Sequence, residues 1–445
     1  MQPTAREVAL KILGECRRNK LRLDAATSAM IDKSGLLERD TALAVRLIKG
    51  VIQNMLYCDY LVAHYSSIGL KKLHPLILDI LRISIYQIVF LTKIPHRAAV
   101  SESVELAKKY TNPRAAVFVN AVLRKVASSM ESGSLPEVMG DSECQRLSIT
   151  YSHPEWLVLE LSSFLGSEGT ESFLKANNSP DTPVTAQINT LLADKETVRS
   201  MLAGDGVDAS EHAWFDDCFE LRSIGKIEQH EVFKKGYIYI QDAAARLAVV
   251  AAGPCPGAMV VDGCASPGGK SFAAAIAMKN SGRILARDIS ATKLNLIADG
   301  AARLGIGIID TEEKDAMEQD FKLSGKADVV IADVPCSGFG AIRKKPDIRY
   351  KSQQDIADLP SIQKSILENL SALVKPGGTL LYSTCTVLKC ENEEVVKAFL
   401  YEHPEFSPER FYLPGIGHVQ DGMTTLWPHI HGTDGFFISK LRRLK

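Results

Sequence analysis

The sequence predicts an α/β protein in three parts: an all-α N-terminal domain, a small α+β module, and a C-terminal doubly wound parallel sheet. Three observations lead to this prediction. Residues 1–128 show helical periodicity with almost no strand signal, residues 145–250 mix short strands with helices, and from residue 257 onward apolar runs alternate with helical segments. At 445 residues the chain is also too long for one ordinary core, so several domains are expected.

The N-terminal domain, residues 1–128, is predicted from segments such as "AREVALKILGECRR" and "RAAVSESVELAKKY", which place apolar residues three and four apart. Its most apolar stretch, "LHPLILDILRISIYQIVFL", contains Asp79 and Arg82, so we interpret it as a buried helix and not as a membrane span. Residues 129–144 are rich in Ser, Gly and Glu, which is typical of a linker. We therefore expect no contact with membranes, and a monomer.

Charge is unevenly distributed along a chain whose net charge is −1. Residues 1–125 hold 20 Lys+Arg against 10 Asp+Glu, and the remainder therefore holds 32 against 43. A basic module suggests a polyanionic partner, although a solvated helical surface explains the same charge equally well. The nine cysteines form no CxxC pair and no metal-ligand spacing, and the start of the sequence has no signal-peptide pattern. We expect a cytoplasmic protein with free thiols and no metal.

The module at 145–250 is predicted from a helix around "PEWLVLELSSFL" and from short strands in "PVTAQINT", "CFELRSI" and "YIYIQ". The C-terminal domain, residues 251–445, then opens with "GAMVVDGCASPGGKSFAAAIAM", which reads as strand, glycine turn and helix. Such a turn lets the backbone approach a ligand, and the helix start offers free N–H groups. The turn is neither GxxxxGK[ST] nor GxGxxG, and a purely structural tight turn is the alternative.

Acids follow the successive predicted strands of this Rossmann-like sheet. Asp288 ends the second strand, twenty residues after Gly268, where such folds place the acid that binds ribose hydroxyls. Asp315 follows the third strand, at a position suited to an adenine amino group, and Asp333 ends the fourth. Carboxylates lining one crevice fit S-adenosylmethionine, whose sulfonium and amino group are cationic.

Two thiols are predicted at the mouth of that crevice, because Cys336 and Cys385 both follow strands that should end there. The cations of "AIRKKPDIR", which include Arg343 and Arg349, and Lys270 in the glycine turn are expected to lower a thiol pKa there. A thiolate at this place suits one particular reaction, the transfer of a methyl group to carbon 5 of a pyrimidine. Carbon 5 of a pyrimidine is weakly nucleophilic, and addition of a thiolate at carbon 6 activates it. One thiol can attack and a second can assist release, but this chemistry alone does not say which does which.

"DVPCSGFGAIRKKPDIR", "STC", "CASPGGK", "IQDAAARLA" and "GTDGFFISKLRR" resemble the Nop/Sun family of RNA cytosine-5 methyltransferases. The N-terminal part, with "IPHRAAVSESVELAKKY" and "FVNAVLRKVA", resembles the NusB-like RNA-binding domain. The resemblance covers nearly the whole chain. It implies a methyltransferase that acts on 16S ribosomal RNA of the small subunit, at cytosine 967 by family expectation.

Carried over by motif, the resemblance makes Cys385 the nucleophile and Cys336 the residue that aids release. It also implies ten positions that bind S-adenosylmethionine: Cys264, Ala265, Ser266, Pro267, Gly268, Gly269, Lys270, Asp288, Asp315 and Asp333. Asp333 has a second expected role, as a carboxyl group that contacts the base.

The sequence departs from the family pattern at three places. Ser266 stands where alanine is usual, Lys314 replaces a common glycine before Asp315, and Gln187 stands where an R-x-N stretch often has arginine. RNA affinity is expected from Lys and Arg of the helical domain, the 145–250 module and "IRKKPDIR".

Two rival functions make different demands on the sequence. A thiol oxidoreductase would need CxxC or GxGxxG, and neither occurs. A non-catalytic RNA-binding assembly or antitermination factor remains the alternative, although both cysteines and every expected carboxylate are present.

Overall fold

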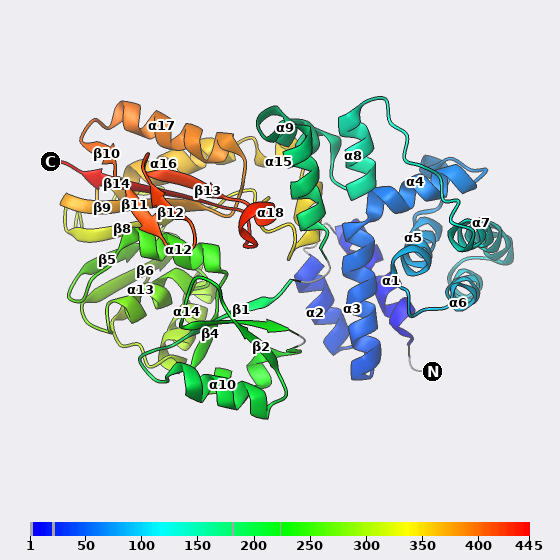
Figure 1. Ribbon diagram of the computed structural model, residues 1–445, viewed down its shortest axis with the longest axis horizontal. Helices are drawn as coiled ribbons and strands as arrows, with labels where there is room; N and C mark the ends of the chain where they lie inside the picture. Colours follow the sequence, from blue (N-terminus) through cyan, green and yellow to red (C-terminus); the bar gives the residue numbers. More distant parts are fainter. Residues whose placement is uncertain (1–2, 20–22, 180–181, 223) are drawn as a thin grey trace. The chain divides into compact units, whose positions relative to one another are not determined.

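The computed structural model describes residues 3–19, 23–179, 182–222 and 224–445 (Figure 1). The chain divides into two compact units. One contains Met1–Asn178 together with Lys344–Tyr350, and the other contains Ser179–Arg343 and Lys351–Lys445. Each is described by itself.

The first unit is helical, as the periodicity predicts. Its core surrounds α5 (Pro75–Phe90), in which Ile80, Ile83 and Ile85 are fully buried and which packs against α1, α3, α4, α6 and α7. His74 accepts a hydrogen bond from the backbone N–H of Leu76 at its start. The elements of this unit are α1 (Ala5–Asn19), α2 (Leu23–Asp32), α3 (Glu38–Gln53), α4 (Met55–Tyr65), η1 (Leu70–Lys72), α5, α6 (His96–Tyr110), α7 (Pro113–Glu131), α8 (Glu143–Tyr151), α9 (Glu155–Asn177) and η3 (Pro346–Tyr350).

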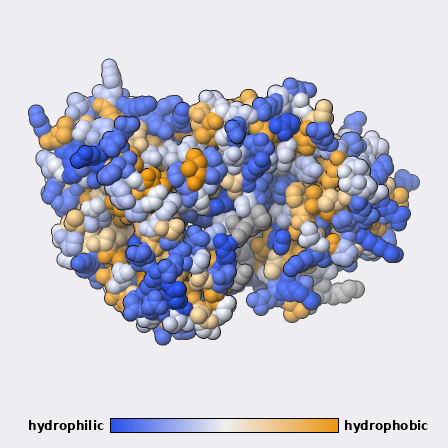
Figure 2. Space-filling model, in the orientation of Figure 1, coloured by the Kyte–Doolittle hydropathy of each residue, from blue (hydrophilic) through white to orange (hydrophobic). Residues whose placement is uncertain are grey.

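The two charges within the apolar stretch are accommodated by ion pairs. Arg82 donates to both carboxylate oxygens of Asp59, at 2.7 Å each, and Asp79 accepts from Arg17 at 2.9 Å. The interpretation of this stretch as a buried helix is confirmed. In the described ranges no helix combines the length and apolarity needed to cross a membrane. Figure 2 shows small apolar patches interleaved with hydrophilic residues on the visible face.

Residues 344–350 leave the second unit and belong to the helical one. Arg349 is fully buried there, and its Nη1 donates to the backbone oxygens of Gln53, Tyr151 and Ser152 and to Oδ1 of Asn178. The distances are 2.8 to 3.3 Å. A segment that follows the Cys336 motif thus completes the core of the N-terminal unit.

The second unit begins with a small antiparallel sheet in the order β2-β3-β1-β4. The apolar core of this module includes Ile188, Phe219 and Ile238. Its elements are β1 (Val184–Ile188), α10 (Lys195–Gly204), β2 (Asp208–Glu211), β3 (Cys218–Arg222), η2 (Ile227–Gln229), α11 (Glu231–Lys234) and β4 (Ile238–Ile240).

The main sheet has the order β10-β14-β9-β8-β5-β6-β7, with β13 paired to β14. The strands β7, β6, β5, β8 and β9 are parallel, and β14 is antiparallel to β9. The chain order reverses between β5 and β8, which is the switch point where doubly wound sheets bind ligands. The strands are β5 (Met259–Asp262), β6 (Arg283–Asp288), β7 (Ile309–Glu313), β8 (Ala327–Asp333), β9 (Val374–Thr384), β10 (Phe406–Pro408), β13 (Met423–Leu426) and β14 (Phe436–Arg443), and β11 (Phe411–Leu413) pairs with β12 (Gly417–Val419).

Helices cover both faces of this sheet, because its strands are apolar on both sides. One face packs against α12, α13 and α14, through residues such as Leu247 and Ile297, and the other against α16 and α17, through residues such as Leu367 and Phe399. The helices of this region are α12 (Ala243–Ala252), α13 (Gly269–Ala277), α14 (Ala291–Arg303), α15 (Gln353–Ile356), α16 (Leu359–Ser371), η4 (Lys389–Glu391), α17 (Glu393–Glu402) and α18 (Pro428–His431). The predicted fold class, with a helical N-terminal domain, an α+β module and a doubly wound sheet, is confirmed.

Candidate functional site

The candidate site lies at the carboxyl edge of the parallel strands. β5, β6 and β8 end in Asp262, Asp288 and Asp333, and β9 ends at Thr384, directly before Cys385. Since parallel strands finish at the same edge, these residues belong to one crevice.

The glycine turn between β5 and α13 is held by backbone hydrogen bonds. Ala265 N–H donates to the carbonyl of Arg287 at 2.8 Å, which ties the turn to β6. Gly268 has φ 106°, a conformation that L side chains rarely adopt, and a Cβ there would lie 2.5 Å from the ring of Phe272. The turn therefore requires glycine at this position.

Asp262, at the end of β5, is a site residue that the sequence analysis did not single out. It is fully buried, and its Oδ2 accepts a hydrogen bond from Ser271 Oγ at 2.7 Å. Burial raises the pKa of Asp262 to about 7, against the smaller opposing effect of Ser271. Its other oxygen has no hydrogen-bond partner among the described residues.

Two of the three predicted cofactor acids, Asp288 and Asp315, differ in exposure. Asp288 is 8% exposed and accepts from the backbone N–H of Ser290 at 3.1 Å. Asp315 is exposed, just beyond β7, and accepts from the backbone N–H of Met317 at 2.8 Å. Both carboxylates keep oxygen lone pairs for a ligand.

Lys270 and Asp333 join the glycine turn to the end of β8. Lys270 Nζ lies 2.6 Å from Asp333 Oδ2, and Ser383 Oγ donates to the other oxygen at 2.8 Å. Lys270 also lies 5.1 Å from the ring centroid of Phe436. Burial disfavours the ammonium group, but the contacts with Asp333 outweigh it, so the pKa of Lys270 is raised. Neither Ser383 nor Phe436 was singled out from the sequence.

The two cysteines meet, as their strand positions predict. Cys336 Sγ lies 3.2 Å from Cys385 Sγ, and both residues are half-buried. Gly340 N–H donates to the carbonyl of Cys385 at 2.9 Å, and the hydroxyls of Ser337 and Thr386 lie 2.7 Å apart. The loops that follow β8 and β9 are therefore bonded directly to each other.

The thiol pair is electrostatically unequal. The hydrogen bond with Cys336 lowers the pKa of Cys385, with Lys270 contributing in the same direction against the effect of burial. The same hydrogen bond, and then burial, raise the pKa of Cys336. The expected lowering of a thiol pKa is thus found at Cys385, with Lys270 among its causes, and not at Cys336. Arg343 does not lower the pKa of Cys336, because its guanidinium donates to the carbonyl of Gly432 at 3.0 Å and lies 3.7 Å from Asp434.

One residue of the expected RNA surface is buried instead, and so is the position at which the family pattern often has arginine. Arg349 is enclosed in the helical unit, so the prediction that it faces RNA is wrong, because backbone carbonyls use its charge. Gln187 is fully buried on β1, where it donates to the carbonyl of Gln241 and accepts from Arg246 Nη1 at 2.6 Å. The position that carries arginine in the family pattern is thus interior here.

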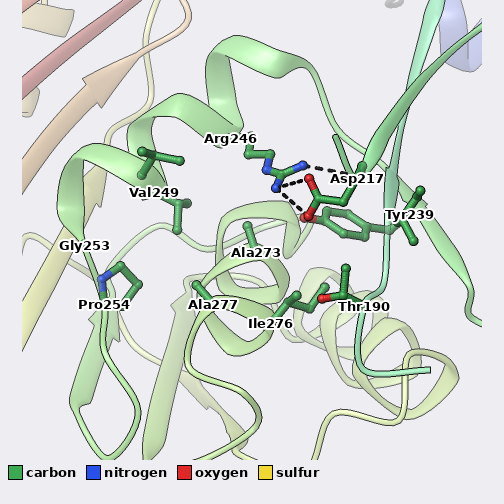
Figure 3. Close-up of a pocket in the computed structure, with 12 residues that line it drawn as sticks. Thr190, Asp217, Tyr239, Arg246, Val249, Gly253, Pro254, Ala273, Ile276 and Ala277 are labelled. Carbon is green, nitrogen blue, oxygen red and sulfur yellow. Dashed lines mark hydrogen bonds and ion pairs between the residues drawn. The ribbon is translucent and has the colours of Figure 1, made fainter. Parts of the chain in front are cut away.

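Arg246 borders a cavity of about 320 Å³ between the small sheet and helices α12 and α13 (Figure 3). Figure 3 shows its guanidinium pointing toward Asp217, with Nη2 at 2.6 and 2.8 Å from the carboxylate oxygens. The guanidinium also lies 4.1 Å from the ring centroid of Phe215. The charge of Arg246 is thus satisfied by the protein, and none of the predicted site residues line this cavity.

No group of three or more His, Cys, Asp or Glu side chains placed to hold a metal ion occurs in the ranges that the structure describes.

Family models match three consecutive parts of the chain. A model described as 16S rRNA methyltransferase RsmB/F matches residues 249–442, one described as the NusB family matches residues 3–128, and one described as a methyltransferase RsmF/B-like ferredoxin-like domain matches residues 153–228. Together with the sheet order, these matches define a Rossmann-like methyltransferase that carries NusB and ferredoxin-like domains.

Full-length relatives are more specific. The probable ribosomal RNA small subunit methyltransferase B of Bacillus subtilis is 36% identical over 99% of both chains, and the ribosomal RNA small subunit methyltransferase B of Pectobacterium carotovorum is 30% identical over 98% of both. The chain belongs to the ribosomal RNA small subunit methyltransferase B (RsmB) family.

Solved structures share this fold. The crystal structure of PH0851 superposes with a TM-score of 0.80 at 26% identity and covers 98% of this chain and 97% of its own. The structure of NSun6 from Pyrococcus horikoshii with SFG has a TM-score of 0.59 at 20% identity, covers 66% of this chain and 98% of its own, and shares the fold.

Proposed function

We propose that this protein uses S-adenosylmethionine to methylate carbon 5 of a cytosine in 16S ribosomal RNA. Cys385 is the nucleophile and Cys336 assists release. The observation that carries the proposal is the 3.2 Å approach of the two thiols at the carboxyl edge of a methyltransferase sheet. The names of the relatives and of the family model support ribosomal RNA as the substrate class.

The crevice fits S-adenosylmethionine on its own chemistry. Asp288 and Asp315 offer carboxylate oxygens at the ends of neighbouring strands, and buried Asp262 holds an oxygen without a partner among the described residues. The turn from Cys264 to Lys270 lets the backbone approach a ligand. When bound, S-adenosylmethionine supplies an electrophilic methyl carbon on a sulfonium.

Cys385 is suited to attack because, of the two cysteines, it is the one whose pKa is lowered, which favours its thiolate. Its sulfur bonds to carbon 6 of the cytosine, and the ring electrons move to carbon 5, which then takes the methyl group. Asp333 and Lys270 both act electrostatically on the attacking thiol. Lys270 can donate a hydrogen bond to N3 of the ring, and Asp333 can accept one from the ring amino group.

Release requires transfer of the carbon-5 proton to a base, the role proposed for Cys336 in its thiolate form, and cleavage of the bond between the sulfur of Cys385 and carbon 6. The electrons of the carbon–hydrogen bond re-form the ring double bond, and Cys385 leaves as a thiolate. Cys336 is next to the departing sulfur and is suited to assist this step. The base must be unstacked for the sulfur to reach it, so a loop or extruded cytosine is the expected substrate.

Two substitutions test the roles. Cys385→Ala is expected to abolish methyl transfer from radiolabelled S-adenosylmethionine to 16S RNA, and Cys336→Ala to accumulate a covalent protein–RNA species that survives denaturing electrophoresis. Cys255→Ala, an exposed cysteine, is the matched control. Normal turnover by Cys385→Ala would contradict the nucleophile assignment.

The target position is tested in cells. Bisulfite sequencing of 16S RNA with and without this protein should show one cytosine that loses its methyl group, and the family expectation is cytosine 967. Calorimetric titration with S-adenosylmethionine separates the enzyme from a non-catalytic RNA-binding factor, for which no heat of binding is expected.

A further inference from the structure

A buried acid lies behind the two cysteine loops. Glu391 ends η4, six residues after Cys385, and is fully buried. Its Oε2 accepts from the backbone N–H of Ser337 at 2.8 Å and from Gln363 Nε2 at 2.9 Å. Charged residues are rarely buried to this degree unless their interactions compensate the lost hydration.

The contact with Ser337 reaches the loop of the other cysteine, because Ser337 directly follows Cys336. Gln363, on α16, donates through the same Nε2 to the carbonyl of Pro335 at 3.0 Å. The residues on either side of Cys336 are thus both held, one by Glu391 directly and one by Gln363, which Glu391 also binds.

The loop of Cys385 is held by the same short segment. Glu391 accepts at its backbone oxygen from the hydroxyl of Tyr382 at 2.6 Å, on β9. The neighbouring Asn392 accepts from Thr384 Oγ1 at 2.6 Å and donates to the carbonyl of Thr386 at 3.1 Å, so it holds the residues on both sides of Cys385.

We propose that Glu391 is a positioning residue that fixes the loop of Cys336 against the loop of Cys385, and so keeps one thiol ready to attack and the other ready to assist release. The catalytic part of this role rests on the proposed function. The hydrogen bonds that hold the two loops do not depend on it. Glu391 touches neither sulfur, and it acts through Ser337 and Gln363. Its charge also adds to the main effects of Cys385 and burial in raising the pKa of Cys336.

The two substitutions of Glu391 separate position from charge. Both hydrogen bonds use one oxygen, so Glu391→Gln can keep them through its amide oxygen while losing the charge. Glu391→Ala removes both hydrogen bonds and leaves their buried donors unpaired. Because the loop of Cys336 then loses its support, we expect turnover to fall by about tenfold or more. Glu394→Gln, an exposed acid three residues on, is the matched control.

The experiment measures alkylation of each cysteine by iodoacetamide as a function of pH, resolved by peptide mass mapping, beside single-turnover methylation. Thiol mapping needs neither RNA nor S-adenosylmethionine, so it decides on Glu391 even if the proposed function fails. We expect Glu391→Ala to bring the two alkylation profiles closer together and to lower turnover. Glu391→Gln should stay within about threefold of wild-type turnover, since a kept hydrogen bond preserves the geometry, and should shift the Cys336 profile to lower pH.

Unchanged alkylation profiles in both Glu391 variants would overturn the proposal. If Glu391→Ala does not fold, Gln363→Leu decides in its place, because it removes the donor that links Glu391 to the carbonyl of Pro335. Alkylation profiles of Cys336 and Cys385 identical to those of wild type and of Glu394→Gln would then refute the positioning role.

Discussion

Lys270 and Asp333, which are 63 residues apart in the sequence, form an ion pair of 2.6 Å beside the nucleophile candidate. Their side chains are only 11% and 26% exposed. The pair connects the glycine turn after β5 to the end of β8, the two strands that flank the switch point of the sheet. The glycine turn and the end of β8, from which the loop of Cys336 begins, are therefore linked by a charge contact that water screens weakly.

Replacing Lys270 by Met should lower single-turnover methylation by about a hundredfold or more, since a preorganised charge at a reacting group typically contributes that much. Asp333 would keep only Ser383 as a partner, and Cys385 would lose one of the groups that lower its pKa. Lys397→Met, on an exposed face of α17, serves as the control. Full activity in Lys270→Met would exclude a role of this ion pair in the reaction.

Replacing Cys336 by Ala should change the titration of Cys385. The hydrogen bond from Cys336 is the main cause that lowers the pKa of Cys385, so its loss should move the alkylation profile of Cys385 to higher pH. Rates of iodoacetamide labelling between pH 6 and 10, read at Cys385, measure the effect. A Cys385 profile that moves to lower pH in Cys336→Ala would be inconsistent with this hydrogen bond. The same would hold if Cys255→Ala moved the Cys385 profile by an equal amount.

Asp262 should make stability depend on pH. Its pKa is raised from 3.8 to about 7 in the folded protein, mainly by burial. Between these values the folded state holds a proton that the unfolded state has released, so the free energy of unfolding falls as pH rises. Asp262→Asn has no carboxyl group at this position and so lacks this pH dependence. The free energy of unfolding of Asp262→Asn minus that of wild type should therefore increase from pH 4.5 to 7.5, by about 4 kcal/mol at most.

Urea unfolding at several pH values gives this difference. Asp299→Asn, on an exposed face of α14, should show no such trend. A constant difference between Asp262→Asn and wild type would contradict the raised pKa.

Arg349 should stabilise the helical unit. Its Nη1 is the donor to three backbone carbonyls and to Asn178, and Arg349→Met would leave these acceptors unpaired, at a cost of about 2–4 kcal/mol. Because one nitrogen makes all these bonds, Arg349→Lys should lose less. Hydrogen exchange at the C-terminal end of α3 and in α8 reports the loss, and exposed Lys345→Ala is the control. Equal exchange in Arg349→Met and wild type would argue against this role.

The sequence predicts most of the parallel sheet well because β5, β6, β8 and β9 each contain an apolar run that ends in a polar residue, whereas β7 is largely polar. From that order alone, Cys336 and Cys385 are expected at one edge, and their 3.2 Å separation confirms it. The ten cofactor positions stay predictions, since their roles rest on motif resemblance.

What the sequence could not provide are contacts that cross between motifs. Glu391 reads as an ordinary acid in "KCENEE", and only the fold shows that it is buried against Ser337. Arg349 reads as part of a basic loop, because the pattern of charges does not reveal that residues 344–350 enter the helical unit.

The membership of residues 344–350 in the helical unit affects how the protein can be made and dissected. During synthesis, the backbone carbonyls that accept from Arg349 lack this donor until residue 350 of 445 has emerged from the ribosome. A fragment ending at Asn178 lacks that donor altogether, so we expect the isolated N-terminal half to be less stable than the same residues in the full chain.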